Sequence, residues 1–308
     1  MQQLSQLPWL ESPFKQVLKN IENKTLAHGL LLGIEKGYGG EILAKQIASA
    51  SLCDDLKSNG ACGICKSCQL FLSNNHPDFY LIEADGNQIK VDQIRELCSK
   101  LTSTSQQGGR RVALFYACER MNQAAANALL KTLEEPGNDT LLILQSNTPA
   151  TLLPTISSRC QRLAFQLPNR NELALWLDKH YGINEDISWA ISIVGGPLNL
   201  VEKWQQGEYQ TLLNVRKSWI QSLHSGHLAN ELRDLSELQI MDALKVLYLV
   251  LRQRLANGKQ LDAFLVSAIT DLASQVMKDC YELSVMPNVN YTGLCQKYIS
   301  SYQKMTRQ

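Results

Sequence analysis

The sequence lacks the features that would direct a protein to a membrane. No apolar run approaches the roughly 18 residues that a membrane-spanning helix needs. VLYLVL at 246–251 is about the longest, and charged residues flank it. The opening MQQLSQLPWLES has neither the basic nor the apolar segment of a signal peptide. We therefore expect a soluble, cytoplasmic protein with no membrane contact.

A strong excess of charge is also absent. The chain of 308 residues carries a formal net charge of +1, so overall charge does not indicate binding to nucleic acid. Hydrophobic residues make up 44% of the chain and charged residues 19%, which is typical of a globular protein and argues against disorder. At about 100–200 residues per domain, the length predicts two or three domains.

Five short apolar runs have the character of buried parallel strands. Helical patterns separate them, at about 41–52, 91–102, 122–134 and 149–156. This alternation predicts an α/β fold whose five-stranded parallel sheet is covered by helices on both faces. The expected strands are Leu30–Ile34, Phe79–Ile82, Val112–Ala117, Leu141–Gln145 and Leu163–Leu167.

The pattern changes after about Leu167, and everything that follows is typical of helices. The segment 237–255 repeats apolar residues at helical spacing, over a face wide enough to be buried against other helices. We predict three domains: residues 1–167 with the sheet, a small helical domain at 168–207, and a larger helical domain at 208–308.

Four of the nine cysteines are grouped. Cys53, Cys62, Cys65 and Cys68 have the spacing C-x8-C-x2-C-x2-C and form an insertion (53–68) between the first sheet helix and the second strand. Four thiolates match tetrahedral Zn²⁺ and leave no open position for water, so the zinc is expected to be structural. The remaining five are scattered and are expected to be small buried side chains. They are Cys98, Cys118, Cys160, Cys280 and Cys295.

The segment LLLGIEKGYGGEILAKQIA runs from a strand through a glycine-rich loop into a helix, as in phosphate-binding loops. A working loop reads G-x-x-x-x-G-K-[ST], with lysine on the phosphates and the hydroxyl on Mg²⁺. When Gly39, which follows Gly37, is aligned with the second glycine, Ile34 replaces the first, Gly40 the lysine and Glu41 the hydroxyl residue. Taken alone, the segment fits a phosphate loop without its chemistry, or an ordinary strand–helix turn.

A second position favours a phosphate loop that has lost its catalytic residues over an ordinary strand–helix turn. In P-loop ATPases, an acidic residue near the end of a buried strand helps to hold Mg²⁺. Here the strand that begins at Val112 runs into Tyr116 and Ala117, and the nearest acid, Glu119, lies beyond its end. Both catalytic positions are lost together, which coincidence explains poorly.

Asn127–Pro136 (NALLKTLEEP), followed by Ser158-Arg159-Cys160, is a specific combination. Together with the cysteine cluster, it resembles the bacterial DNA polymerase III clamp-loader subunits of the AAA+ superfamily. The lost ATPase residues and Pro8-Trp9-Leu10 are similar to the non-hydrolysing subunit of that family. The resemblance is strong over about residues 8–167 and weak beyond. It implies an AAA+ P-loop module, a helical lid and a helical collar domain for oligomerisation.

The resemblance also implies a role for Ser158 and Arg159. The arginine would reach ATP bound to the neighbouring subunit as an arginine finger in trans, although a surface ion pair is the alternative for an isolated Ser-Arg-Cys. The implied partners are the gamma/tau and delta subunits in a hetero-pentamer, the sliding clamp, primed DNA through the complex, and single-stranded-DNA-binding protein indirectly. The chain itself would not be an enzyme, and would belong to the DNA polymerase III holoenzyme.

Other charged residues have simpler interpretations. Glu134 and Glu135 are adjacent on a helix and point in different directions, so we expect a solvated helix end and not a catalytic carboxylate pair. His28 and His76 do not fit the zinc spacing and are expected to be structural.

Two other hypotheses remain. One is a divergent active AAA+ ATPase, which turnover by the purified chain would support. The other is a zinc-dependent nucleic-acid-binding module, for which basic and aromatic residues should surround the cysteines. The insertion and its surroundings offer Lys57, Lys66 and Phe71 and no arginine, so the second hypothesis is weak.

Overall fold

The computed structural model describes residues 4–107, 109–257, 262–285 and 290–306. The chain divides into two compact units, which we call the sheet unit (residues 1–182) and the helical unit (183–308). The predicted boundary between a lid and a collar stays a prediction. Within the described residues, α7 (Arg170–Tyr181) belongs to the sheet unit, whereas α8 (Ile191–Val194) and α9 (Pro197–Gln205) belong to the helical unit.

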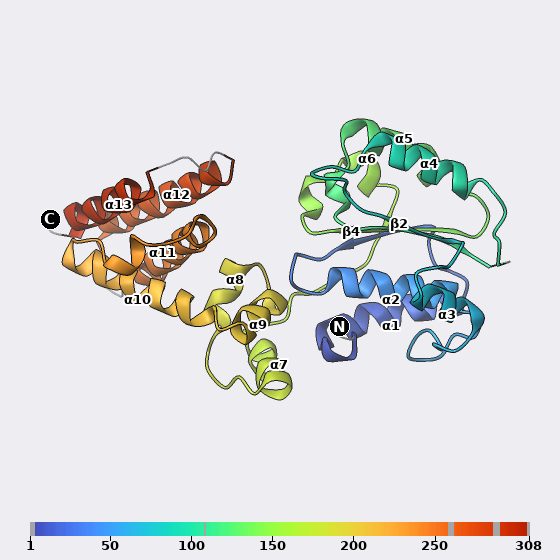
Figure 1. Ribbon diagram of the computed structural model, residues 1–308, viewed down its shortest axis with the longest axis horizontal. Coiled ribbons are helices and arrows are strands. Elements are labelled where there is room, and N and C mark those ends of the chain that lie inside the picture. The colour runs from blue at the N-terminus through green and yellow to red at the C-terminus, as the bar shows by residue number, and fades with distance from the viewer. Residues whose placement is uncertain (1–3, 108, 258–261, 286–289, 307–308) are drawn as a thin grey trace. The chain divides into compact units, whose positions relative to one another are not determined.

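The sheet unit is built on five parallel strands in the order β2-β3-β4-β1-β5. Figure 1 shows one face covered by α1, α2 and α3 and the other by α4, α5 and α6. The strands are β1 (Gly29–Gly33), β2 (Phe79–Ile82), β3 (Arg111–Phe115), β4 (Thr140–Ser146) and β5 (Gln161–Arg162). The helices are α1 (Pro8–Glu22), α2 (Gly40–Leu52), α3 (Lys66–Leu72), α4 (Val91–Leu101), α5 (Gln123–Glu134) and α6 (Pro154–Ser157), with the 3-10 turns η1 (Leu4–Gln6), η2 (Cys118–Arg120) and η3 (Pro149–Thr151).

Two predicted elements were wrong in position. The fifth strand is Gln161–Arg162, and both residues are exposed because they pair on one side with β1 at the sheet edge. The apolar run Leu163–Leu167 follows that strand, and Leu167 is 51% exposed. The helix expected at 149–156 is broken into η3 and α6, since a proline is favoured in the first turn of a helix and Pro154 starts a new one.

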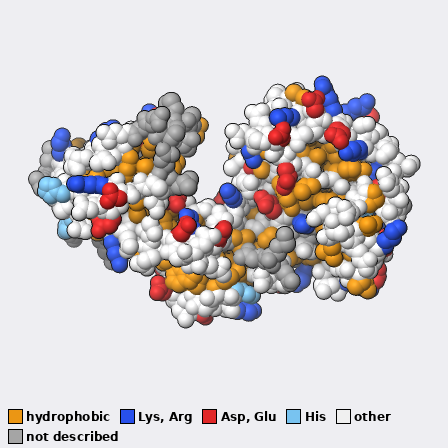
Figure 2. Space-filling model, viewed as in Figure 1, with side chains coloured by type: hydrophobic (Ala, Val, Ile, Leu, Met, Phe, Trp, Pro, Cys, Tyr) orange, Lys and Arg blue, Asp and Glu red, His pale blue; other side chains and the backbone are white. Residues whose placement is uncertain are grey.

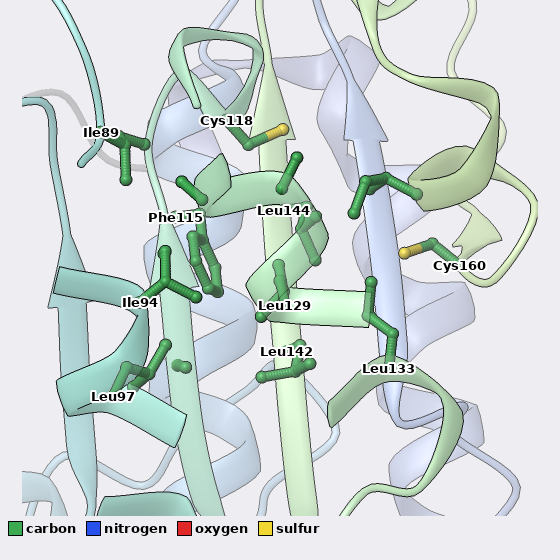
Figure 3. Close-up of a cluster of buried hydrophobic side chains, with 14 of the residues drawn as sticks. Ile89, Ile94, Leu97, Phe115, Cys118, Leu129, Leu133, Leu142, Leu144 and Cys160 are labelled. Carbon is green, nitrogen blue, oxygen red and sulfur yellow. The ribbon is translucent and has the colours of Figure 1, made fainter. Parts of the chain in front are cut away.

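One core of the sheet unit lies between the sheet and the helices α4 and α5 (Figure 3). Phe115 from β3, Leu129 from α5 and Leu142 and Leu144 from β4 are fully buried there. Asn122 caps α5 by accepting a hydrogen bond from the Ala125 N–H at 2.8 Å, which fixes the apolar face of this helix against the sheet. The predicted alternation of buried strands and amphipathic helices is confirmed.

Helices also make up the described part of the helical unit: η4 (Ser188–Ala190), α8, α9, α10 (Tyr209–Ser225), η5 (Asn230–Leu232), α11 (Glu237–Asn257), α12 (Ala263–Val285) and α13 (Tyr291–Thr306). Of the apolar face predicted at 237–255, Leu244, Leu247 and Leu251 are fully buried. Trp219 of α10 is buried against α11 and donates a hydrogen bond from Nε1 to the Ala243 carbonyl at 2.9 Å. Among the described residues, no helix is long and apolar enough to cross a membrane.

Candidate nucleotide loop, cysteine cluster and arginine edge

The glycine-rich loop lies where open α/β sheets bind ligands. β1 and β4 are neighbours in the sheet, but α2 follows β1 on one face and α6 follows β4 on the other (Figure 1). Where the helices that follow two neighbouring strands lie on opposite faces of the sheet, a crevice opens at the carboxyl ends of those strands. Gly37 and Gly39 both have left-handed φ angles, of 76° and 87°, so the chain turns sharply there before α2 begins at Gly40.

Gly40, which was aligned with the P-loop lysine from the sequence, is closely packed. A Cβ atom added to Gly40 would lie 3.1 Å from the Ile34 Cβ and 3.2 Å from the Gln145 Nε2. A longer side chain at residue 40 would therefore have to push the side chains of Ile34 and Gln145 aside. Glu41, which follows Gly40 in the first turn of α2, is exposed, and its negative charge acts on Tyr116 at the end of β3.

The loop is also bonded to the rest of the sheet unit. Trp9 of α1 donates a hydrogen bond from Nε1 to the Tyr38 carbonyl at 2.9 Å. The Trp9 ring packs edge-on against Trp176 of α7 at 4.9 Å between centroids, and the Tyr38 ring packs edge-on against Phe165 at 6.5 Å. Trp9 and Phe165 thus contact the loop directly, and Trp176 packs against Trp9.

The end of β3 is joined to the end of β4 by hydrogen bonds. The Ala117 N–H donates to the Gln145 Oε1 at 3.0 Å, and the Gln145 Nε2 donates to the Asn147 Oδ1 at 3.1 Å. Glu119, the nearest acid, accepts a hydrogen bond from the Asn147 N–H at 3.2 Å. Burial, with the negative charge of Glu41, raises the pKa of Tyr116 to about 12, so a neutral phenol stands near this crevice.

The four clustered cysteines come together in space. Their Sγ atoms all lie within 4.8 Å of one another, and those of Cys62 and Cys68 are 3.9 Å apart. Tetrahedral Zn–S bonds of about 2.3 Å would place the sulfurs about 3.8 Å apart, so the cluster fits a metal ion of this kind. The N–H groups of Cys65 and Ile64 lower the pKa of the Cys62 thiol to about 7, whereas burial raises the pKa of the Cys53 and Cys68 thiols.

A buried polar network joins the cysteine cluster to the sheet. Ser67, between two cluster cysteines, bonds through Oγ to the His76 Nε2 at 2.7 Å. The His76 Nδ1 accepts a hydrogen bond from the Asp78 N–H, and the Asp78 carboxylate accepts hydrogen bonds from the N–H groups of Gln106 and Gln107. His76 is therefore structural, as predicted.

Arg159 lies at the other end of the strands from the glycine-rich loop. Gln161, two residues later, pairs with Leu30 at the start of β1, and a Cβ added to Gly29 would lie 3.5 Å from the Arg159 carbonyl oxygen. Arg159 therefore lies near the amino ends of the strands, about 13 Å along β1 from the loop at a rise of about 3.3 Å per residue.

The arginine is held by two contacts. Its Nε and Nη2 lie 2.8 and 2.6 Å from the Glu134 Oε1, and its Nη1 donates to the Thr155 carbonyl at 2.9 Å. Ser158, its predicted companion, is exposed and bonds through Oγ to the same carbonyl at 3.4 Å. The ion pair considered in the sequence analysis therefore exists, and its acid is Glu134.

Comparison with known proteins identifies the family. A family model described as DNA polymerase III, delta subunit, matches residues 10–169. DNA polymerase III subunit delta' of Escherichia coli K12 is 31% identical over 254 residues, which cover 77% of this chain and 76% of that protein.

The chain belongs to the DNA polymerase III delta-prime family.

Other relatives match over a shorter length. The delta-prime subunit of Pseudomonas aeruginosa is 42% identical over 172 residues, 55% of this chain and 52% of that protein, so the match spans about half the length of that relative. A gamma subunit-related protein of Thermotoga maritima is 19% identical, covering 96% of this chain and 92% of that one, with a TM-score of 0.39. The RuvB motor of that organism is 14% identical, covering 96% and 86%, with a TM-score of 0.44. Structural likeness at this level adds nothing to the assignment.

The expectation of an AAA+ P-loop module with a helical region after it is confirmed for this delta-prime family member. Sequence reasoning missed two residues near its candidate sites. Glu134 was expected to be a solvated helix end, but its carboxylate is paired with Arg159. Gln145 was assigned only to a strand, and its amide occupies the space beside Gly40.

Proposed function

We propose that this delta-prime family chain is a non-hydrolysing subunit of the bacterial clamp loader, and that Arg159 acts on ATP bound to the neighbouring subunit. The observation that carries the proposal is the position of Arg159, partly exposed at the amino-terminal edge of the sheet and far from its own loop. An always-charged guanidinium with paired donors suits a phosphate in trans.

The state of its own loop supports the non-hydrolysing part of the proposal. Gly40 offers no cation, Glu41 brings a negative charge, and Tyr116 and Ala117 stand at the strand end where ATPases bind Mg²⁺. The space beside Gly40 is closed by Ile34 and Gln145. Mg-ATP would therefore lack its main ligands in this chain.

We also propose that the cysteine cluster binds one structural Zn²⁺. The donor set is four sulfurs, and N–H groups of Cys62, Cys65 and Cys68 donate to the sulfurs of Cys53, Cys62 and Cys65 at 3.2–3.4 Å. Four sulfur ligands leave no position for a reacting water, which supports a structural role over a catalytic one.

The proposed partners follow from the family and from this division of roles. They are the gamma/tau and delta subunits, the sliding clamp, and primed DNA reached through the complex, with single-stranded-DNA-binding protein as an indirect partner. On the face of the sheet unit in Figure 2, blue and red side chains are interspersed, so charge on this face favours neither sign. That distribution is consistent with a subunit that reaches DNA as part of an assembly.

Co-assembly with an active P-loop subunit tests the proposal. ATP turnover should be absent from the pure chain, should appear in the reconstituted complex, and should fall when this chain carries Arg159→Ala. Turnover by the pure chain after rigorous exclusion of partners would favour the divergent ATPase instead. Turnover of the complex that is unchanged by Arg159→Ala would refute the arginine role.

A further inference from the structure

Glu134 is the one carboxylate that Arg159 contacts among the described residues, and the contact is two-pronged. Both the Nε and the Nη2 of Arg159 lie within 2.8 Å of the Glu134 Oε1. The two side chains are 35% and 51% exposed, respectively. A pair this open to water contributes little to folding, so stability alone is a poor explanation for its geometry.

The end of α5 that carries Glu134 is itself fixed. His28, at the start of β1, bonds through Nε2 to the Leu133 carbonyl at 2.9 Å, and a carbonyl can only accept, so the ring donates. The Leu133 side chain is buried beside β1 and Cys160 (Figure 3). The residue before Glu134 is therefore tied to the sheet through both its carbonyl and its side chain.

A second anchor comes from α6. The Thr155 carbonyl accepts one N–H of the Arg159 Nη1 at 2.9 Å. The guanidinium is thus held from α5 by a carboxylate and from α6 by a carbonyl. Two contacts from separate elements restrict both the rotation and the tilt of its plane.

The contacts leave donors available. A guanidinium has five N–H groups, and three of those on Arg159 are used by Glu134 and Thr155. Within the part of the chain that the structure describes, one N–H on each terminal nitrogen has no acceptor. Two donors on adjacent nitrogens are what a bidentate phosphate contact uses.

We propose that Glu134 is a positioning residue that orients Arg159 so that its two remaining terminal N–H groups face the phosphate of a neighbouring subunit's nucleotide. The inference rests on the proposed function of Arg159 and names Glu134 as the carboxylate that orients it. A preoriented guanidinium needs no reorganisation when charge develops in the transition state. Removal of Glu134 should therefore lower kcat and leave the KM for ATP nearly unchanged.

The test uses the reconstituted complex with variants of this chain. Glu134→Ala should lower the kcat of ATP hydrolysis at the affected interface about 10- to 100-fold, the range expected for a misplaced catalytic group. Glu134→Gln retains an oxygen acceptor for the Arg159 Nε and should recover part of that loss. The double variant Glu134→Ala/Arg159→Ala should be no slower than Arg159→Ala alone, because both changes act through one guanidinium.

Glu135→Ala is the matched control, since Glu135 is exposed and its carboxylate has no hydrogen bond or ion pair among the described residues. It should match the wild type, and melting curves and assembly should be the same for all variants. Wild-type kcat in Glu134→Ala, with Arg159→Ala still impaired, would overturn the positioning role and leave the proposed function standing. A raised kcat would also overturn it, because Glu134 would then restrain Arg159. An Arg159→Ala complex of full activity would overturn both.

Discussion

At the carboxyl-terminal edge of the sheet, the glycine-rich loop is bonded to its own chain, whereas at the amino-terminal edge Arg159 is partly exposed. In the loop, the Tyr38 carbonyl accepts a hydrogen bond from Trp9. Gly40, which was aligned with the P-loop lysine, lies against Ile34 and Gln145. The arginine, by contrast, keeps two N–H groups beyond the contacts with Glu134 and Thr155. The two edges belong to one sheet and share β1.

Under the proposed function, this difference would mean that the two halves of an ATPase interface are physically separable. A site that binds its own nucleotide needs a cation, a hydroxyl and an acid around an open loop. A site that acts in trans needs one oriented guanidinium at a surface. In the proposed function, packing replaces the nucleotide site of this chain while the arginine that acts in trans remains, and about 13 Å of strand separates the two.

The largest expected effect comes from removing the arginine. Arg159→Ala should lower ATP hydrolysis at one interface of the reconstituted complex by about 10³-fold or more, the range measured for arginine fingers. Substrate binding should change less than kcat, since the contact strengthens in the transition state. Single-turnover hydrolysis stimulated by clamp and primed DNA is the measurement, with assembly checked by gel filtration.

Arg159→Lys sharpens the same comparison. An ammonium keeps the charge but lacks the planar fork, so it cannot contact Glu134, Thr155 and a phosphate together. We expect poor rescue, within about tenfold of the alanine variant. Full rescue would mean that charge alone, and not the held geometry, matters at this edge.

Loss of the metal should have the next largest effect. Cys65→Ser should release about one Zn²⁺ per chain and destabilise the sheet unit by about 4 kcal/mol or more, because metal binding is coupled to folding. Metal analysis and urea unfolding measure the two effects. Cys98→Ser, outside the cluster, should retain the metal; native protein without zinc under reducing conditions would refute the site.

Restoring the P-loop residues tests whether the glycine-rich loop can regain ATP hydrolysis. Gly40→Lys with Glu41→Thr should not restore ATP hydrolysis, since β3 still ends in Tyr116 and Ala117. It should lower the free energy of unfolding by about 1–3 kcal/mol through overpacking against Ile34 and Gln145. Glu41→Thr alone, at an exposed site, should change it by less than about 0.5 kcal/mol. Turnover by the double variant would show that neither the packing at Gly40 nor the lack of an acid at the end of β3 prevents hydrolysis.

The smallest effect is expected at the contact between α1 and the loop. Trp9→Phe removes the donor to the Tyr38 carbonyl and should lower the free energy of unfolding by about 0.5–1.5 kcal/mol. Thermal or urea unfolding is the measurement. If the substitution instead enables nucleotide binding, then this hydrogen bond is what keeps the loop closed.

Much of the fold could be predicted because the strands β1, β3 and β4 are continuous buried apolar runs between amphipathic helices. The edge strand β5 was misplaced because Gln161 and Arg162 are polar, and backbone pairing with β1 is a tertiary contact that leaves no local pattern. The break at Pro154 was missed because apolar residues continue across it.

The candidate site was predictable where chemistry depends on residue type and spacing. The grouping of the four cysteines could be predicted because their spacing in the sequence alone fits a metal site, and their sulfurs lie close together in the structure. The partnership of Glu134 with Arg159 joins residues 25 positions apart, and that of Gln145 with Ala117 joins residues 28 apart. Such pairs are fixed by how helices and strands pack, which periodicity does not reveal.

The place of β1 in the sheet has a consequence for folding during synthesis. Gly33 pairs with Ser146, 113 positions later, and Leu30 pairs with Gln161, 131 positions later. At a synthesis rate of about 5–20 residues per second, β4, the first strand that pairs with β1, leaves the ribosome about 6–23 s after β1 does. Its second neighbour, β5, arrives directly after Arg159. The newly made chain therefore completes its sheet late, and the segment that carries the arginine is the one that closes it.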